Sequence, residues 1–144
     1  MRNPWCTLQT IPVSGTVVST GSIPLVRART VSLTVRLTFD GSVDADTTVY
    51  VYYSPDGNKW DTIHYTSFVI AFTVSTTKQR TVILDIPEHG YLRVEITNGS
   101  SAGTVTQPRI WYTIQSWEEI GTETLPNILK RALLLQKQEE TGQI

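Results

Sequence analysis

The 144-residue chain lacks most of the features that would place it in a class at once. Its single cysteine, Cys6, cannot form an internal disulfide, so the fold must depend on packing. The two histidines, His64 and His89, have no cysteine or carboxylate at the spacing of a zinc site, and we expect surface or packing roles for both. There is no glycine-rich phosphate loop and no Gly-x-Ser-x-Gly elbow. We therefore expect a protein without cofactor, small-molecule substrate or enzymatic activity.

The chain also has little net charge and no long apolar run in its β region. Twelve basic and 13 acidic residues give a net charge of −1, which indicates no nucleic-acid partner and no anionic membrane surface. The longest apolar stretch of the β region, residues 68–72, is too short to cross a bilayer. Residues 1–5 hold no apolar run that could act as a signal peptide. We expect a protein made in a reducing compartment and not exported by the general secretory route.

Two-residue alternation is what the chain has in abundance. It indicates half-buried strands from Thr7 to about Gln115. In the run 49–53, Tyr50 and Tyr52 alternate with valines, so this strand should be central or covered by a partner. Pro108 interrupts the last run, which favours an edge position or a bulge there. The runs cover residues 31–37, 49–53, 68–72, 82–86, 92–96 and 105–114, with shorter candidates at 7–11, 15–19 and 23–26.

Strands at roughly eight-to-twelve-residue spacing, with no helix between them, pair antiparallel. The fold class is therefore all-β, an antiparallel β-sandwich or jelly roll. We divide the chain into an N-terminal arm or first strand (1–14), the sandwich domain (15–116) and a C-terminal helical arm (117–144).

The C-terminal arm is predicted from a change of period. After Gln115, apolar residues switch to the spacing of an amphipathic α-helix. Leu134 falls nearly opposite Leu125 on such a helix, so the helix should be covered from two sides. An apolar helix without a second helix to pack on suggests a docking arm. The expected partner interface comprises Trp5, Trp117, Leu125, Ile128, Leu129, Ala132, Leu133, Leu134 and Leu135.

Two loops carry patterns that deserve a separate interpretation. Asp40, Asp44 and Asp46 recur in one loop at calcium-loop spacing, but Ala45 and Val51 stand where glycine and a bidentate glutamate are expected. A solvated hairpin loop is thus the stronger interpretation, with calcium as the alternative.

The second pattern is Ser54-Pro55-Asp56-Gly57-Asn58-Lys59-Trp60. It predicts a structural turn in which Asp56 caps the backbone, Gly57 takes a positive φ and Trp60 folds back over the loop. Ligand contact by Trp60 is the alternative role for this segment.

Residues 52–62, with their Ser-x-Asp-Gly-x-x-Trp hairpin, are followed by the strand Gly90–Asn98, which contains Tyr-x-Arg-Val-x-x-x-Asn. In these segments the chain resembles small β-sandwich virion proteins of tailed phages, over about residues 15–115. The resemblance implies a non-enzymatic virion protein made in the host cytoplasm, such as a capsid decoration (cement) protein or a neck or tail component. Its partners would be further copies of itself, in a trimer for example, and a capsid or neck protein.

The alternative function is carbohydrate binding. Trp60 and nearby tyrosines could form a stacking surface for sugar rings, although aromatic residues on strands more often belong to a core or an interface. Sequence alone leaves open the bound partner, the oligomeric state and any exchange of the helix between subunits.

Overall fold

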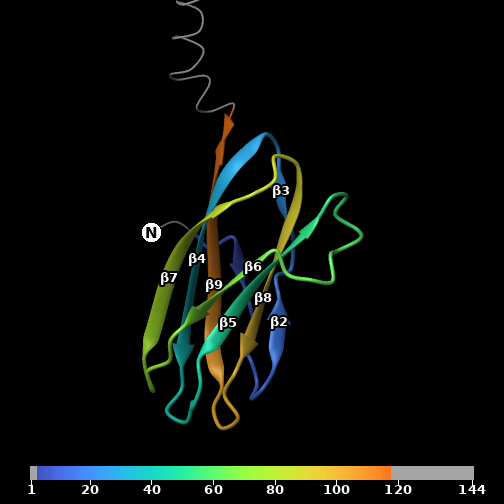
Figure 1. Ribbon diagram of the computed structural model, residues 1–144. Helices are drawn as coiled ribbons and strands as arrows, with labels where there is room; N and C mark the ends of the chain where they lie inside the picture. Colours follow the sequence, from blue (N-terminus) through green and yellow to red (C-terminus); the bar gives the residue numbers. More distant parts are fainter. Residues whose placement is uncertain (1–2, 118–144) are drawn as a thin grey trace, which may run out of the picture.

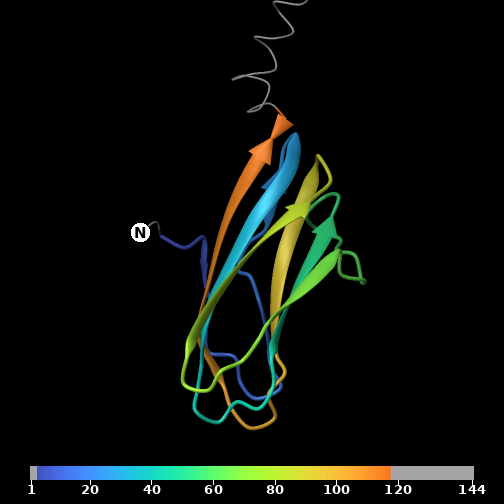
Figure 2. The ribbon, with the colours of Figure 1, turned by 60° about the vertical axis from the view of Figure 1, so that its left-hand side comes forward.

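The structure is a computed structural model that describes residues 3–117. These residues form nine strands in two sheets, and all pairs are antiparallel. Figures 1 and 2 show the sheets as two layers of an elongated sandwich. The first sheet has the order β1 (Cys6–Thr7), β9 (Val105–Ser116), β4 (Ala28–Phe39) and β7 (Thr77–Asp85). The second has the order β2 (Thr16–Val18), β8 (Gly90–Asn98), β5 (Thr47–Ser54) and β6 (Thr66–Ile70), and β3 (Ile23–Leu25) also pairs with β8.

The predicted all-β antiparallel sandwich is confirmed, and its core follows the predicted alternation. Successive side chains of a strand point to opposite faces, so every second residue of β4, β5 and β8 faces the other sheet. Over residues 31–39 of β4, 47–52 of β5 and 92–98 of β8, those residues are buried and the residues between them are half-buried. The central core side chains are Val31, Leu33, Val35, Leu37, Val49, Val51, Leu92, Val94 and Ile96. Within residues 3–117 there is no helix long and apolar enough to span a membrane.

The β5 strand is central, as predicted, because it lies between β8 and β6. Alternation along the predicted run 68–72 would place Phe72 on the same inward face as Phe68 and Ile70, but the structure does not place it there. The β6 strand ends at Ile70, and Phe72 follows it with 37% of its surface exposed, because the chain has already left the sheet.

The predicted irregularity at Pro108 is a β-bulge. Arg36 pairs with Arg109 and Thr38 with Thr106, so two residues of β9, Gln107 and Pro108, lie opposite a single residue of β4. Gln107 has a φ of 52°, in the left-handed region. Such a bulge bends the strand and changes the direction of nearby side chains.

The structure describes residues 3–14 of the predicted N-terminal segment and Trp117 of the predicted C-terminal arm. Within 1–14, β1 pairs with β9, and Ile11 is fully buried where it bridges to Val105, so part of this segment belongs to the sandwich. The predicted C-terminal helix, with all its leucines, lies outside the described residues. Trp117 is described, and 45% of its surface is exposed.

Candidate functional site

The outer face of the second sheet gathers aromatic and charged side chains on its two central strands. Tyr50 and Tyr52 alternate with buried valines on β5, and Arg93 and Glu95 alternate with buried residues on β8. The pairing register places Tyr52 opposite Arg93 and Tyr50 opposite Glu95. Residues directly opposite on one face of a sheet have their side chains in contact range. These four residues, with Trp60 and His64 from the β5–β6 loop, are called the aromatic face below.

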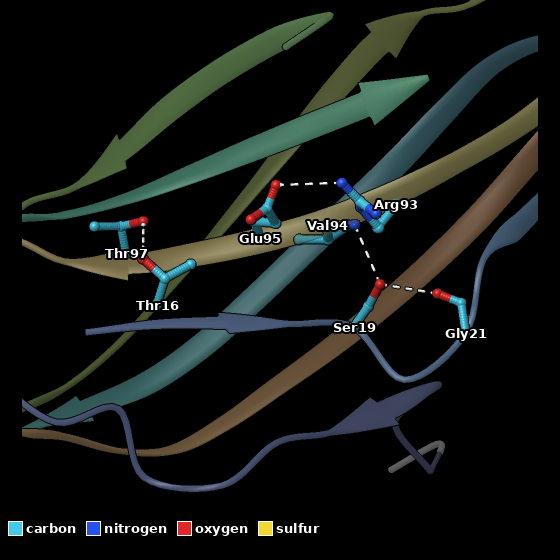
Figure 3. A network of polar contacts seen from close by, with 7 residues as sticks. All are labelled: Thr16, Ser19, Gly21, Arg93, Val94, Glu95 and Thr97. Atoms are coloured by element: carbon cyan, nitrogen blue, oxygen red, sulfur yellow. Dashed lines mark hydrogen bonds and ion pairs between the residues drawn. The ribbon is translucent and has the colours of Figure 1, made fainter. Parts of the chain in front are cut away.

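Arg93 is at the centre of the aromatic face. Its guanidinium carbon lies 4.8 Å from the centre of the Trp60 ring and 5.4 Å from that of Tyr52. It also pairs with Glu95, with 3.7 Å between nitrogen and oxygen, and Figure 3 shows both side chains on the same side of β8. The Nε of Arg93 is buried and has no hydrogen-bond partner among the described residues. The guanidinium is therefore positioned by Trp60, Tyr52 and Glu95.

His64 extends the aromatic face on the other side of the tyrosines. Its ring centre lies 5.0 Å from that of Tyr50 and 6.3 Å from that of Tyr52, and its side chain is exposed. Two backbone hydrogen bonds hold this part of the loop to β5: Asp61 N–H donates to Tyr53 O (3.0 Å) and Tyr65 N–H donates to Val51 O (2.7 Å). The loop, green at the right of Figure 1, therefore has a fixed relation to the strand that carries the tyrosines.

The predicted Ser54–Trp60 turn places Trp60. Asp56 Oδ1 accepts hydrogen bonds from the backbone N–H groups of Asn58 (2.8 Å) and Lys59 (2.9 Å). These bonds, that of Lys59 first, lower the pKa of the Asp56 carboxyl group. The Oγ of fully buried Ser54 accepts from Gly57 N–H (2.8 Å) and donates to Lys59 O (2.7 Å).

Gly57 has the predicted positive φ, +81°. A Cβ atom there would also come within 3.2 Å of the Tyr91 ring, so glycine suits the site for two reasons. The Arg93 guanidinium, from β8, lies over the ring of Trp60.

The three candidate calcium ligands cap backbone groups in separate places. Asp40 accepts from Thr104 N–H and Ser42 N–H, Asp44 from Ser101 N–H and hydroxyl, and Asp46 from Phe72 N–H. Hydrogen bonds from Thr104 and Ser42 lower the pKa of Asp40, and the Ser101 hydroxyl leads those that lower the pKa of Asp44. No group of three or more His, Cys, Asp or Glu side chains within residues 3–117 could hold a metal ion.

The remaining tryptophans lie away from the aromatic face. Trp5 packs edge-on against Tyr112, with ring centres 5.2 Å apart, and Trp111 lies on the outer face of the first sheet, opposite Thr34. The guanidinium of Arg29 lies 5.1 Å from the ring centre of Trp117. The expected interface residues Trp5 and Trp117 are therefore not brought together with Trp60.

No family model and no curated protein matches the sequence. The fold, however, is similar to solved structures. One, described as "CBM4 structure and function", has a TM-score of 0.55 at 14% identity and covers 76% of this chain and 70% of the other. A non-crystalline cellulose specific carbohydrate-binding module, CBM28, has a TM-score of 0.50 at 9% identity, covering 76% and 74%. Tailspike protein 4 of bacteriophage CBA120 has a TM-score of 0.50 at 15% identity, covering 76% of this chain and 15% of that one.

At these identities the similarity establishes the fold alone. Two carbohydrate-binding modules and a tailspike domain share this jelly-roll-like sandwich. The resemblance to phage virion proteins is thus supported only at the level of the sandwich.

Sequence reasoning found Trp60 and the tyrosines but not the three polar members of the face. Alternation along residues 92–96 indicates only that Arg93 and Glu95 face outward, and His64 was expected in a surface or packing role. Arg93 joins the site because β8 pairs with β5 in the register that sets it beside Tyr52. The alternation of the two strands was visible in the sequence, but their adjacency was not.

Proposed function

We propose that this protein binds carbohydrate, without catalysis, through the aromatic face. Sugar rings present flat patches of C–H groups and a rim of hydroxyls. Trp60, Tyr50 and Tyr52 supply aromatic rings for the patches. Arg93, Glu95 and His64 supply charged or polar groups for the hydroxyls.

The observation that carries this proposal is the position of Arg93. It lies between two aromatic rings on an outer face and keeps a buried Nε without a partner in residues 3–117. The Arg93 side chain is 29% exposed, so its terminal nitrogens, and not the buried Nε, would meet the hydroxyls of a sugar beside Trp60 and Tyr52.

The proposal is tested by titrating the full chain with neutral soluble polysaccharides, namely a β-glucan, a xylan and a galactan. We expect tryptophan fluorescence to change with at least one of them, and affinity electrophoresis to show retardation. Stacking of a flat ring on an aromatic side chain is worth about 1–3 kcal/mol in nucleic-acid complexes. By analogy, Trp60→Ala should weaken binding by roughly tenfold or more.

Trp117→Ala is the matched control, because it removes another solvent-accessible indole away from the aromatic face. It should leave binding unchanged. The proposal is wrong if no polysaccharide binds, or if Trp60→Ala binds as tightly as the unaltered protein while both melt at the same temperature.

A second candidate function is a structural role in a phage particle, in contact with further copies of the chain and with a capsid or neck protein. It is supported by the apolar helical pattern of residues 125–135 in the sequence and by the exposed Trp117 just before that segment. Light scattering tests it. The full chain should form an oligomer, and a chain ending at Trp117 should be a folded monomer. Equal masses for the two chains would contradict the docking-arm hypothesis.

A further inference from the structure

A surface pocket lies on the outer face of the first sheet, in the opposite layer from the aromatic face. It has a volume of about 360 Å³, at the lower end of the range of small-ligand sites. It forms where β4 and the bulge of β9 meet the N-terminal segment. Its lining residues are Asn3, Pro4, Arg36, Thr38, Gln107, Arg109 and Trp111. We call it the arginine pocket.

The two arginines give the pocket its chemistry. Arg36 and Arg109 are direct partners across the β4–β9 pair, and both are half-buried. Among the described residues that line the pocket, none is an aspartate or a glutamate, so the two arginines make its lining basic. A guanidinium presents a planar fork of donors that matches the two oxygens of a carboxylate.

The bulge fixes one side of this arrangement. Arg109 Nη1 donates to the carbonyl oxygen of Pro108 (3.1 Å), which uses one of the five donors of its guanidinium and holds the group at the bulge. Gln107, in its left-handed conformation, also lines the pocket and offers an amide there. The pocket is thus shaped by the bulge in the β9 backbone as well as by the two arginine side chains.

Trp111 adds an apolar surface beside the charges. It is the next outward residue of β9 after Arg109, and it lines both the arginine pocket and a neighbouring depression of about 300 Å³. Trp5 and Tyr112 line that depression too. A ligand in the arginine pocket would therefore meet a carboxylate-binding pair on one side and an aromatic ring on the other.

We propose that the arginine pocket binds a carboxylate-bearing sugar, as in a uronic acid polymer. Its carboxylate would be held by Arg36 and Arg109, and its ring would lie against Trp111. An acidic peptide could also satisfy the arginines, but the aromatic ring in the same pocket favours a charged ligand whose ring has a C–H face to stack on Trp111. This site shares no residue with the aromatic face and does not depend on neutral-glycan binding there.

The test is affinity electrophoresis and calorimetry of the full chain with polygalacturonate, with a neutral galactan and polyglutamate as comparison polymers. We expect binding to polygalacturonate that weakens as salt is added. The double variant Arg36→Gln/Arg109→Gln should lose at least about tenfold in affinity, since it removes both charge-assisted contacts. Arg29→Gln removes a charge from the same strand away from the pocket, and its affinity should stay within about twofold of that of the unaltered protein.

Arg36→Lys keeps the charge but removes the two-pronged donor geometry, so it should lose affinity by several fold while the fold is unaffected. This variant keeps the test decisive if the double variant is unstable. Trp60→Ala should leave polygalacturonate binding unchanged.

Three results would each overturn the proposal. The first is no binding to polygalacturonate, and the second is equal binding to polyglutamate, which would assign the pocket to acidic peptides. The third is loss of polygalacturonate binding in Trp60→Ala with retention in the arginine variants, which would move the uronate to the aromatic face. Neutral-polysaccharide binding is measured in parallel, so failure of the arginine pocket and failure of the aromatic face give different patterns.

Discussion

At the scale of single residues, short polar side chains hold the loops that carry the larger aromatic ones. Ser54 and Asp56 together organise the turn before Trp60, through bonds to five backbone groups of residues 56–59. Asp40 and Asp44 do the same for the loops at the other end of the sandwich. Carboxylates in such positions stabilise the fold only while they are ionised.

Asp56→Asn tests this at the turn. Because the pKa of Asp56 is lowered in the folded state from an ordinary value of 3.8, its ionised form stabilises the protein above that pH. This contribution is lost as the pH falls through the lower folded pKa. The variant should therefore be less stable than the unaltered protein at neutral pH, and the difference should shrink at about pH 2.5. Urea denaturation of both proteins, at neutral pH and at about pH 2.5, measures the difference in their free energies of unfolding.

Asp61→Asn, an exposed carboxylate in the same loop, is the control and should show no comparable change in that difference. If Asp56→Asn were equally destabilised at both pH values, the ionised carboxylate would not be the stabilising group.

At the scale of elements, connections between strands depend on one buried amide. Asn98, at the end of β8, is 1% exposed. Its Nδ2 donates to the carbonyl oxygens of Pro12 (3.1 Å) and Gly103 (2.9 Å), and its Oδ1 accepts from Ser100 N–H (3.0 Å). The N-terminal segment and the β8–β9 loop are thus joined through this side chain.

Asn98→Asp replaces this donor with a second oxygen of nearly the same shape. The carbonyl oxygens of Pro12 and Gly103 would then face a carboxylate, and each unmade buried hydrogen bond costs about 1–3 kcal/mol. We expect a loss of at least about 3 kcal/mol in the free energy of unfolding at neutral pH. Chemical denaturation measures it. The control is Thr97→Val, on the outer face of the same strand, which should lower the free energy of unfolding by less than about 1 kcal/mol. A similarly small loss in Asn98→Asp would contradict the role given to the amide.

At the scale of the whole molecule, the sandwich presents two outer faces with different chemistry. The second sheet carries the aromatic face and the first carries the arginine pocket, so both proposed sites can be occupied at once. The described residues 3–117 contain both sheets and the core between them. A chain ending at Trp117 should therefore melt cooperatively and keep both kinds of glycan binding, even if removing the tail abolishes its assembly. Circular dichroism and affinity electrophoresis of the shortened chain check this.

Much of the architecture was predictable because burial alternates along each strand. Val31, Leu33, Val35 and Leu37 show their inward direction in the sequence, and Pro108 marks the bulge because it has no N–H for a ladder bond. Phe72 departs from the alternation because β6 ends at Ile70, and the point at which a chain leaves a sheet has no signal in the period of its residues.

The sequence alone established an antiparallel sandwich, its inward residues and the turn that ends at Trp60, because these depend on local periodicity and backbone preference. The partnership of Arg93 with Trp60 and Tyr52, and that of Arg36 with Arg109, came from the order and register of strands far apart in the chain. Such non-local pairing is set by the packing of the whole core, which no short stretch of residues encodes.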